Sequence, residues 1–345
     1  MPATKKVRVL VVDDSLVFRE TLAREIARDP GIEVVATAAD PYAARDRILE
    51  FEPDVMTLDV EMPRMSGIEF LKRLIPQYPL PVVVVSAVSD SVFDALDAGA
   101  VDYVAKPDHK AGRGMDPFIS ELIVKIKIAS TANLAAAKNP GLVAAPLVRV
   151  GAAGRNCVIA IGASTGGTEA IETVLRAFPE DMPGTVIVQH MPAVFTAMYA
   201  QRLNHSCAVE VREAKKGDRV LPGRVLVAPG GSHMRVKRLN GDYIVECYQG
   251  EKVSGHCPSV DVLFHSMADQ VGAGGIGVVL TGMGSDGAAG LLALRRSGGR
   301  TIGQDERSSV VYGMPKAAFD LGAVQEEVPL GQIARKLITL VHGRR

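Results

Sequence analysis

The sequence repeats one pattern along its length, in which short apolar runs of strand length alternate with segments of helical periodicity. Near the N-terminus Phe18, Leu22 and Ile26 recur at every fourth position, which predicts a helix over Leu16–Arg28. Strands that alternate with helices form βαβ units, so we expect a five-stranded parallel sheet in the first third. Its expected strands are Val7–Val12, Glu33–Ala38, Asp54–Leu58, Val82–Val85 and Asp102–Val104.

The second half of the chain repeats this alternation after a segment, 129–153, that is rich in Ala, Pro and Gly. That composition is typical of an interdomain linker, so we expect domains at 5–128 and 154–345. Asn240-Gly241 favours a two-residue hairpin turn between Met234–Leu239 and Tyr243–Tyr248. We therefore expect a doubly wound, mostly parallel α/β domain that carries an antiparallel hairpin. The other expected strands are Cys157–Ile161, Thr185–Gln189, Arg224–Ala228, Ile276–Thr281 and Arg300–Gly303.

Composition excludes several classes of protein. The 39 Lys and Arg residues balance 39 Asp and Glu residues, which is not the basic balance of a nucleic-acid binder. No apolar run reaches the roughly 18–20 residues that span a bilayer, and Met1–Val12 does not resemble a signal peptide. The four cysteines form no CxxC pair, so we expect reduced thiols in a cytoplasmic protein.

Charged or hydroxyl side chains follow four expected strands of the first domain. Asp13 and Asp14 follow the first strand, Asp59 the third, and Ser86 and Lys106 the fourth and fifth. The first pair alone could be a helix N-cap, but parallel strands bring all of these residues to one edge of the sheet. Crowded carboxylates repel one another unless a cation joins them, and Mg²⁺ prefers such oxygen ligands. The sequence therefore predicts a Mg²⁺-dependent phosphate site here.

A second set of strand ends carries Ser164, His190 and Asp286. Gly162-Ala-Ser164-Thr-Gly166 fits the G-x-S-x-G turn that exposes a nucleophilic serine, although a phosphate-binding loop fits equally well. An imidazole at a neighbouring strand end can take the serine proton, and an acid can orient that imidazole. His256 is the rival base and Asp305 the rival acid, and Asp286 could also merely cap a helix.

The first domain resembles the receiver domain of two-component response regulators over roughly residues 5–128. The matching segments are Val-Val-Asp13-Asp14-Ser, Leu-Asp59-Val-Glu-Met-Pro, Ser86-Ala and Asp-Tyr103-Val-Ala-Lys106-Pro. The resemblance implies a flavodoxin-like fold in which a chemotaxis histidine kinase phosphorylates Asp59. It also implies Mg²⁺ ligation by Asp13, Asp14, Asp59 and the Glu61 carbonyl, phosphoryl contacts from Ser86 and Lys106, and a switch role for Tyr103.

The whole chain resembles the chemotaxis protein-glutamate methylesterase family. The matching segments of the second domain are Ile-Gly-Ala-Ser164-Thr-Gly-Gly, Val-Gln-His190-Met-Pro, Val-Ala-Pro229-Gly-Gly, Pro258-Ser-Val-Asp-Val-Leu-Phe and Leu-Thr-Gly-Met283-Gly-Ser-Asp286-Gly. The resemblance implies a serine hydrolase, without a cofactor for this step, that demethylates glutamate methyl esters on chemoreceptors and deamidates receptor glutamines. It implies Ser164 as nucleophile, His190 as base, Asp286 as orienting acid, and Thr165 and Met283 as oxyanion support.

Two other functions remain open from the residues alone. A receiver domain often controls a DNA-binding output, but the neutral charge and the strand–helix units of the second domain disfavour one. The glycine loops Gly162–Gly167 and Gly282–Gly287 could instead hold a nucleotide. No G-x-G-x-x-G with a following ribose-binding acid supports that alternative.

Overall fold

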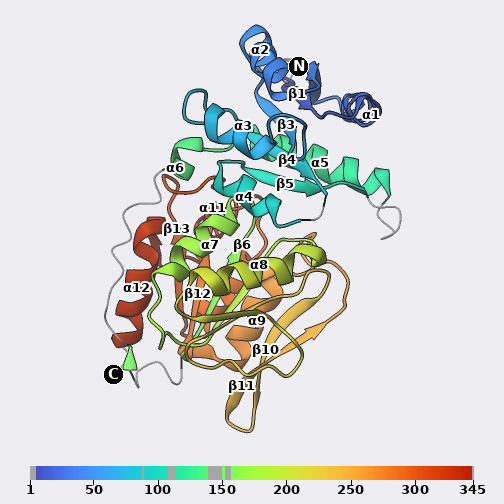
Figure 1. Cartoon of the computed structure of the whole chain (residues 1–345). Coiled ribbons are helices and arrows are strands. Elements are labelled where there is room, and N and C mark those ends of the chain that lie inside the picture. Colours follow the sequence, from blue (N-terminus) through green and yellow to red (C-terminus); the bar gives the residue numbers. More distant parts are fainter. Residues whose placement is uncertain (1–4, 88, 108–113, 139–149, 152–156, 344–345) are drawn as a thin grey trace. The chain divides into compact units, whose positions relative to one another are not determined.

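The computed structural model describes residues 5–87, 89–107, 114–138, 150–151 and 157–343, and it divides into two compact units. The first unit comprises Met1–Leu134 and the second Ala135–Arg345, and each is described here by itself (Figure 1). Of the predicted linker 129–153, residues 139–149 and 152–153 lie outside the described residues. The described part of that linker contains a short helix, α6 (Leu134–Lys138).

The first unit is the expected five-stranded parallel sheet, with strand order β2-β1-β3-β4-β5. This order is that of flavodoxin-like folds, in which functional groups collect at the carboxyl ends of the strands. The strands are β1 (Val7–Val12), β2 (Ile32–Ala38), β3 (Val55–Asp59), β4 (Val82–Ser86) and β5 (Asp102–Ala105). The helices are α1 (Leu16–Ile26), α2 (Pro41–Phe51), α3 (Gly67–Leu74), α4 (Ser91–Asp97) and α5 (Met115–Ala129).

The second unit contains a seven-stranded parallel sheet with strand order β14-β13-β12-β6-β7-β9-β8. Its strands are β6 (Val158–Ala163), β7 (Thr185–Gln189), β8 (Glu210–Glu213), β9 (Arg224–Val227), β12 (Gly275–Val279), β13 (Arg300–Gln304) and β14 (Glu326–Val328). The sequence did not predict β8 and β14. Both are short, charged edge strands, so they carry no apolar run from which a strand could be recognised.

Helices join most of the parallel strands of the second unit, whereas a loop, 214–223, joins β8 to β9. The helices are α7 (Gly167–Arg176), α8 (Ala193–Ser206), α9 (Val260–Gln270), the 3₁₀ turn η3 (Gly272–Gly274), α10 (Ala288–Arg296), α11 (Met314–Asp320) and α12 (Leu330–His342). The expected hairpin is present as β10 (His233–Leu239) and β11 (Asp242–Tyr248). Asn240 and Gly241 close it with φ angles of 51° and 92°, as the sequence predicted.

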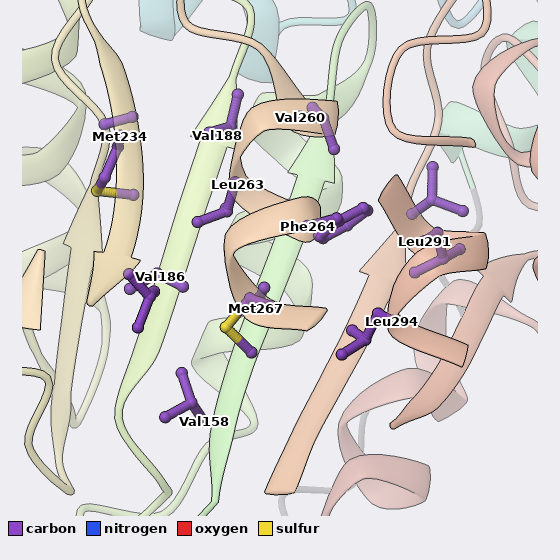
Figure 2. Close-up of a cluster of buried hydrophobic side chains, with 14 of the residues drawn as sticks. Val158, Val186, Val188, Met234, Val260, Leu263, Phe264, Met267, Leu291 and Leu294 are labelled. Carbon is purple, nitrogen blue, oxygen red and sulfur yellow. The ribbon is translucent and has the colours of Figure 1, made fainter. Parts of the chain in front are cut away.

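Helix α9 is central to the apolar core of the second unit. Leu263, Phe264 and Met267 on this helix are fully buried. Around the helix lie side chains from β6, β7, β10 and α10, among them Val158, Val186, Val188, Met234, Leu291 and Leu294 (Figure 2). Burying one such side chain is worth about 1.5–3 kcal/mol. The core therefore fixes α9, and with it the N-terminus of that helix.

None of the described helices is long and apolar enough to cross a membrane. No disulfide joins any of the four cysteines, all of which lie within the described residues.

Candidate active site and acidic cluster

Three predicted site residues of the second unit lie at the ends of its three central strands. β6 has β7 on one side and β12 on the other, so the strand order reverses at β6. In open α/β sheets such a reversal leaves a crevice at the carboxyl ends of the strands. Ser164 follows β6, His190 follows β7, and Asp286 lies in the loop after β12. The sheet thus brings together residues that are up to 122 positions apart in the sequence.

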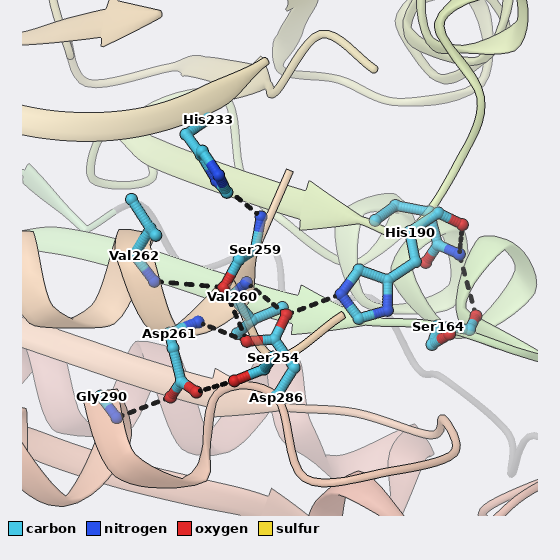
Figure 3. A network of polar contacts seen from close by, with 11 residues as sticks. Ser164, His190, His233, Ser254, Ser259, Val260, Asp261, Val262, Asp286 and Gly290 are labelled. Carbon is cyan, nitrogen blue, oxygen red and sulfur yellow. Dashed lines mark hydrogen bonds and ion pairs between the residues drawn. The ribbon is translucent and has the colours of Figure 1, made fainter. Parts of the chain in front are cut away.

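Asp286 is buried and accepts hydrogen bonds at both carboxylate oxygens. Oδ2 accepts from His190 Nε2 at 2.8 Å and from the Val260 N–H at 2.8 Å. Oδ1 accepts from the Ser259 hydroxyl at 2.7 Å and from the Asp261 N–H at 2.9 Å (Figure 3). These N–H groups begin helix α9, where the helix dipole favours an anion. Asp286 therefore does not cap its own following helix α10, but lies at the N-terminus of α9.

The surroundings of Asp286 favour its ionised form. Burial alone would raise the pKa of Asp286 and favour the neutral acid. The hydrogen bond and charge of His190 lower the pKa, and so do the hydrogen bonds from the Asp261 N–H and the Ser259 hydroxyl. The balance lowers the pKa of Asp286 below its usual range. An ionised Asp286 requires a proton on His190 Nε2, so a neutral His190 has its lone pair on Nδ1.

His190 Nδ1 is buried and has no hydrogen-bond partner among the described residues. The His190 ring lies between Asp286 and Ser164 (Figure 3). No hydrogen bond joins this ring to the Ser164 hydroxyl in the described part of the chain, and such bonds often form only when substrate is present. Nδ1 is therefore the nitrogen that can accept a proton on the Ser164 side.

Ser164 lies in a tight turn between the end of β6 and the start of α7. Its N–H donates to Thr281 O at 3.0 Å, and its carbonyl accepts from Gln189 Nε2 at 2.9 Å. Gly166 has a φ of 74°, and a Cβ on Gly162 would lie 2.2 Å from Val260 Cγ1. Small residues are therefore required here, which is the reason that G-x-S-x-G signals this turn.

Thr165 and Met283 were predicted to support an oxyanion. Thr165 is buried, and its carbonyl accepts from the Thr281 hydroxyl at 3.0 Å. Met283 is 48% exposed and follows Gly282, on which a Cβ would lie 2.6 Å from Ser164 Cβ. The loop after β12 therefore runs against Ser164, which brings the backbone near Met283 close to the serine.

The two rival residues are placed differently. Asp305 accepts from the Ser308 N–H and hydroxyl, and it forms no ion pair or hydrogen bond with a histidine in the described structure. His256 stacks on the His190 ring, with 3.6 Å between the centroids. Asp286 is therefore the acid that contacts His190.

The sequence did not predict that Ser259, which is supported by His233, binds Asp286. Ser259 is fully buried, and its N–H donates to His233 Nδ1 at 3.3 Å while its hydroxyl donates to Asp286. His233 Nε2 in turn contacts the carbonyl of Glu251 at 2.8 Å. The Pro258-Ser-Val-Asp segment was a signal for this group, but spacing alone could not link it to Asp286.

The predicted acidic cluster forms at the strand ends of the first unit. Carboxylate oxygens of Asp13, Asp14 and Asp59 lie within 4.8 Å of one another. Ser15, not either aspartate, caps helix α1 by accepting from the Phe18 N–H. The carboxylates of Asp13 and Asp14 are therefore not used as the helix cap, and the donor set fits a hard cation such as Mg²⁺.

Lys106 lies directly against this cluster. Its Nζ donates to Asp13 Oδ2 at 2.8 Å and to Asp59 Oδ2 at 2.5 Å. Burial raises the pKa of Asp59 above its usual range, although Lys106 opposes the rise. Burial disfavours the charged form of Lys106, but its bonds to Asp13 and Asp59 outweigh this effect and raise its pKa. A divalent cation would favour ionised Asp59 further.

The remaining predicted residues surround the same edge of the sheet. Ser86 is fully buried, and its hydroxyl has no hydrogen-bond partner among the described residues. Tyr103 is 4% exposed. The Glu61 N–H donates to Asp59 Oδ1 at 3.1 Å, which places the Glu61 backbone beside the cluster. The buried hydroxyl of Ser86 is free to bond an incoming oxygen.

Comparison with known proteins agrees with both units. The family model "CheB methylesterase" matches residues 159–337, and "Response regulator receiver domain" matches residues 9–112. A protein-glutamate methylesterase/protein-glutamine glutaminase of Syntrophomonas wolfei is 61% identical, covering 98% of each chain. A protein of the same name from Syntrophotalea carbinolica is 54% identical, covering 99% of each chain.

A solved structure gives the same result for the second unit. The CheB methylesterase catalytic domain of Thermotoga maritima is 36% identical, with a TM-score of 0.52, and covers 53% of this chain and 98% of its own. The second unit therefore matches a methylesterase domain and not a DNA-binding domain, which was the alternative from the sequence. The chain belongs to the CheB methylesterase family and carries an N-terminal response regulator receiver domain.

Proposed function

We propose that this chain is a phosphorylation-controlled serine hydrolase that demethylates glutamate methyl esters on chemoreceptors and deamidates specific receptor glutamines. The observation that carries the proposal is the placement of His190 between an ionised Asp286 and Ser164 at the strand-order reversal. The names of the relatives that match the full chain supply the substrate class. A receptor helix is a large substrate, which suits a site at the open edge of a sheet.

In the proposed reaction, Ser164 Oγ attacks the side-chain carbonyl of the methylated glutamate while His190 Nδ1 takes the hydroxyl proton. The negative charge moves to the carbonyl oxygen, which backbone N–H groups of Thr165 and Met283 would stabilise. The C–O bond then breaks, and methanol leaves with the proton from His190. An ester between Ser164 and the glutamate side chain remains.

Water resolves this ester through the same groups. His190 takes a proton from the attacking water, a second tetrahedral oxyanion forms, and Ser164 leaves with the proton returned. The product is a free glutamate carboxylate. With a glutamine substrate the first leaving group is ammonia, and all later steps are identical.

The receiver domain would supply control. Asp59 would accept a phosphoryl group from a chemotaxis histidine kinase, and Asp13, Asp14, Asp59 and the Glu61 carbonyl would hold Mg²⁺. Bound Mg²⁺ would neutralise charge on the transferring phosphoryl group. Lys106 and the buried Ser86 hydroxyl would bond its oxygens, and Tyr103 would turn into the space that Ser86 leaves.

We propose that the unphosphorylated receiver restricts substrate access and that phosphorylation relieves this restriction. No cofactor is proposed for ester hydrolysis. The enzyme would act in the cytoplasm on the cytoplasmic part of its receptors, without nucleic acid and without inserting into the membrane.

Substitution of the serine tests the proposed chemistry. Ser164→Ala should reduce methanol release from methylated receptor membranes by several orders of magnitude. Its fold should persist, because the structural hydrogen bonds of Ser164 come from its backbone. Covalent labelling by a serine-directed acylating probe should disappear in parallel, and nucleotide should not compete with the probe. Near-wild-type methanol release from the folded variant would refute the assignment.

A further inference from the structure

The imidazole rings of His190 and His256 lie face to face. Their centroids are 3.6 Å apart, and their planes differ by 4°. The His256 side chain forms no hydrogen bond to any residue that the structure describes. His190 is therefore contacted in two ways, by Asp286 at one ring nitrogen and by His256 over one ring face.

A short, closed loop holds His256 in this place. Val253 and His256 exchange two backbone hydrogen bonds of 3.0 Å across Ser254 and Gly255, whose φ angles are 52° and 84°. The Ser254 hydroxyl donates to Asp261 Oδ2 at 2.9 Å. Asp261 lies on α9, the same helix whose first N–H groups hold Asp286. One helix thus anchors both groups that contact the His190 ring.

A hydrogen bond to one ring atom fixes that atom, but it leaves the ring free to turn about the bond. A flat neighbour over the ring face opposes this turning. We propose that His256 is a positioning residue that keeps the imidazole of His190 in the plane in which Nε2 meets Asp286 and Nδ1 faces Ser164. This inference rests on the proposed function, because it assigns His256 a part in the same hydrolysis.

The charge state of His256 agrees with this role. The pKa of His256 is lowered to about 4, chiefly by burial and next by the neighbouring His190; Asp286 opposes the shift and Lys252 adds to it. His256 is therefore neutral near pH 7. His190 becomes cationic during the reaction, and a neutral aromatic face attracts a cation whereas a protonated ring would repel it. His256 supplies the face without acting as a base.

Three variants of the full chain separate ring stacking from proton transfer. His256→Ala removes the ring and should lower kcat at least about tenfold with little change in KM, because small misplacements of a reacting group are costly. His256→Phe keeps a flat face that cannot carry a proton, and it should stay within about threefold of the wild type. His256→Gln keeps polarity without the ring and should behave like the alanine variant.

A phenylalanine variant as inactive as the alanine variant would overturn the proposal and would indicate proton transfer by His256. An alanine variant with wild-type kcat would overturn it as well. A second readout does not depend on turnover: the ¹⁵N resonances of the His190 ring should be sharp in the wild type and in His256→Phe.

In folded His256→Ala those His190 resonances should broaden because the ring can turn. Unchanged resonances there would refute the positioning role whatever the activity. Absence of methanol release from the wild-type protein would instead refute the proposed function, so the two failures are distinguishable.

Discussion

Replacement of Asp286 by asparagine tests the electrostatic arrangement of the site most directly. Both carboxylate oxygens face donors, since Oδ1 meets the Ser259 hydroxyl and the Asp261 N–H, and Oδ2 meets His190 and the Val260 N–H. An amide has only one oxygen. Whichever way it is oriented, its NH₂ group faces a buried backbone N–H that is left without an acceptor.

The structure sets the size of the effect on stability. One buried N–H without a partner costs about 1–3 kcal/mol, and the other hydrogen bonds lose their charge assistance. We therefore expect Asp286→Asn to lower the free energy of unfolding by about 2–4 kcal/mol. The pKa of Asp286 is lowered in the folded state, so its stabilisation is present at neutral pH and is lost as the pH falls below about 4.

The same substitution should reduce kcat by about 10²–10⁴-fold, or roughly 3–5.5 kcal/mol of activation free energy. The neutral amide no longer stabilises the imidazolium, and in one orientation it forces the His190 proton onto Nδ1. The loss should be smaller than that of His190→Ala, which removes the base itself.

The assay is methanol release from methylated receptor membranes, with unfolding followed by circular dichroism. Asp305→Asn is the matched control, because the Asp305 carboxylate accepts hydrogen bonds only from Ser308 among the described residues. It should keep near-wild-type kcat. If Asp305→Asn proves the more damaging change, the orienting acid has been assigned to the wrong strand end.

Three further predictions use other parts of the chain. Asp59→Asn should lose Mg²⁺-dependent phosphorylation and stimulation by a small phosphodonor yet keep basal hydrolysis; stimulation that persists would contradict the phosphoacceptor assignment. A chain beginning at Gly154 should release methanol faster than the unphosphorylated full chain, and an equal rate would refute restricted access. Gly282→Ala should lower both kcat and Tm, because its Cβ would lie 2.5 Å from Met314 Sδ and 2.6 Å from Ser164 Cβ. Wild-type values for both would show that the loop shifts without cost.

Local patterns determined the fold class and much of the chemistry. Buried parallel strands are continuous apolar runs, so β1, β3, β4, β6 and β7 could be recognised without long-range information. The Gly166 turn after Ser164 and the Asn240-Gly241 hairpin depend on backbone angles that few residues adopt, so they were predictable too. The edge strands β8 and β14 lacked such signals, since exposed edges favour charged residues.

Tertiary structure decided which of these residues act together. Strand order placed β6 between β7 and β12, and that order depends on pairings between segments far apart in the sequence. Only this packing set Asp286 on the first N–H groups of α9, and His256 flat against His190. Hydrophobic periodicity reveals relations between residues two to four positions apart. These contacts instead join residues about 25 to 96 positions apart. The sequence therefore determined which residues are available, and the packing of α9 determined their geometry.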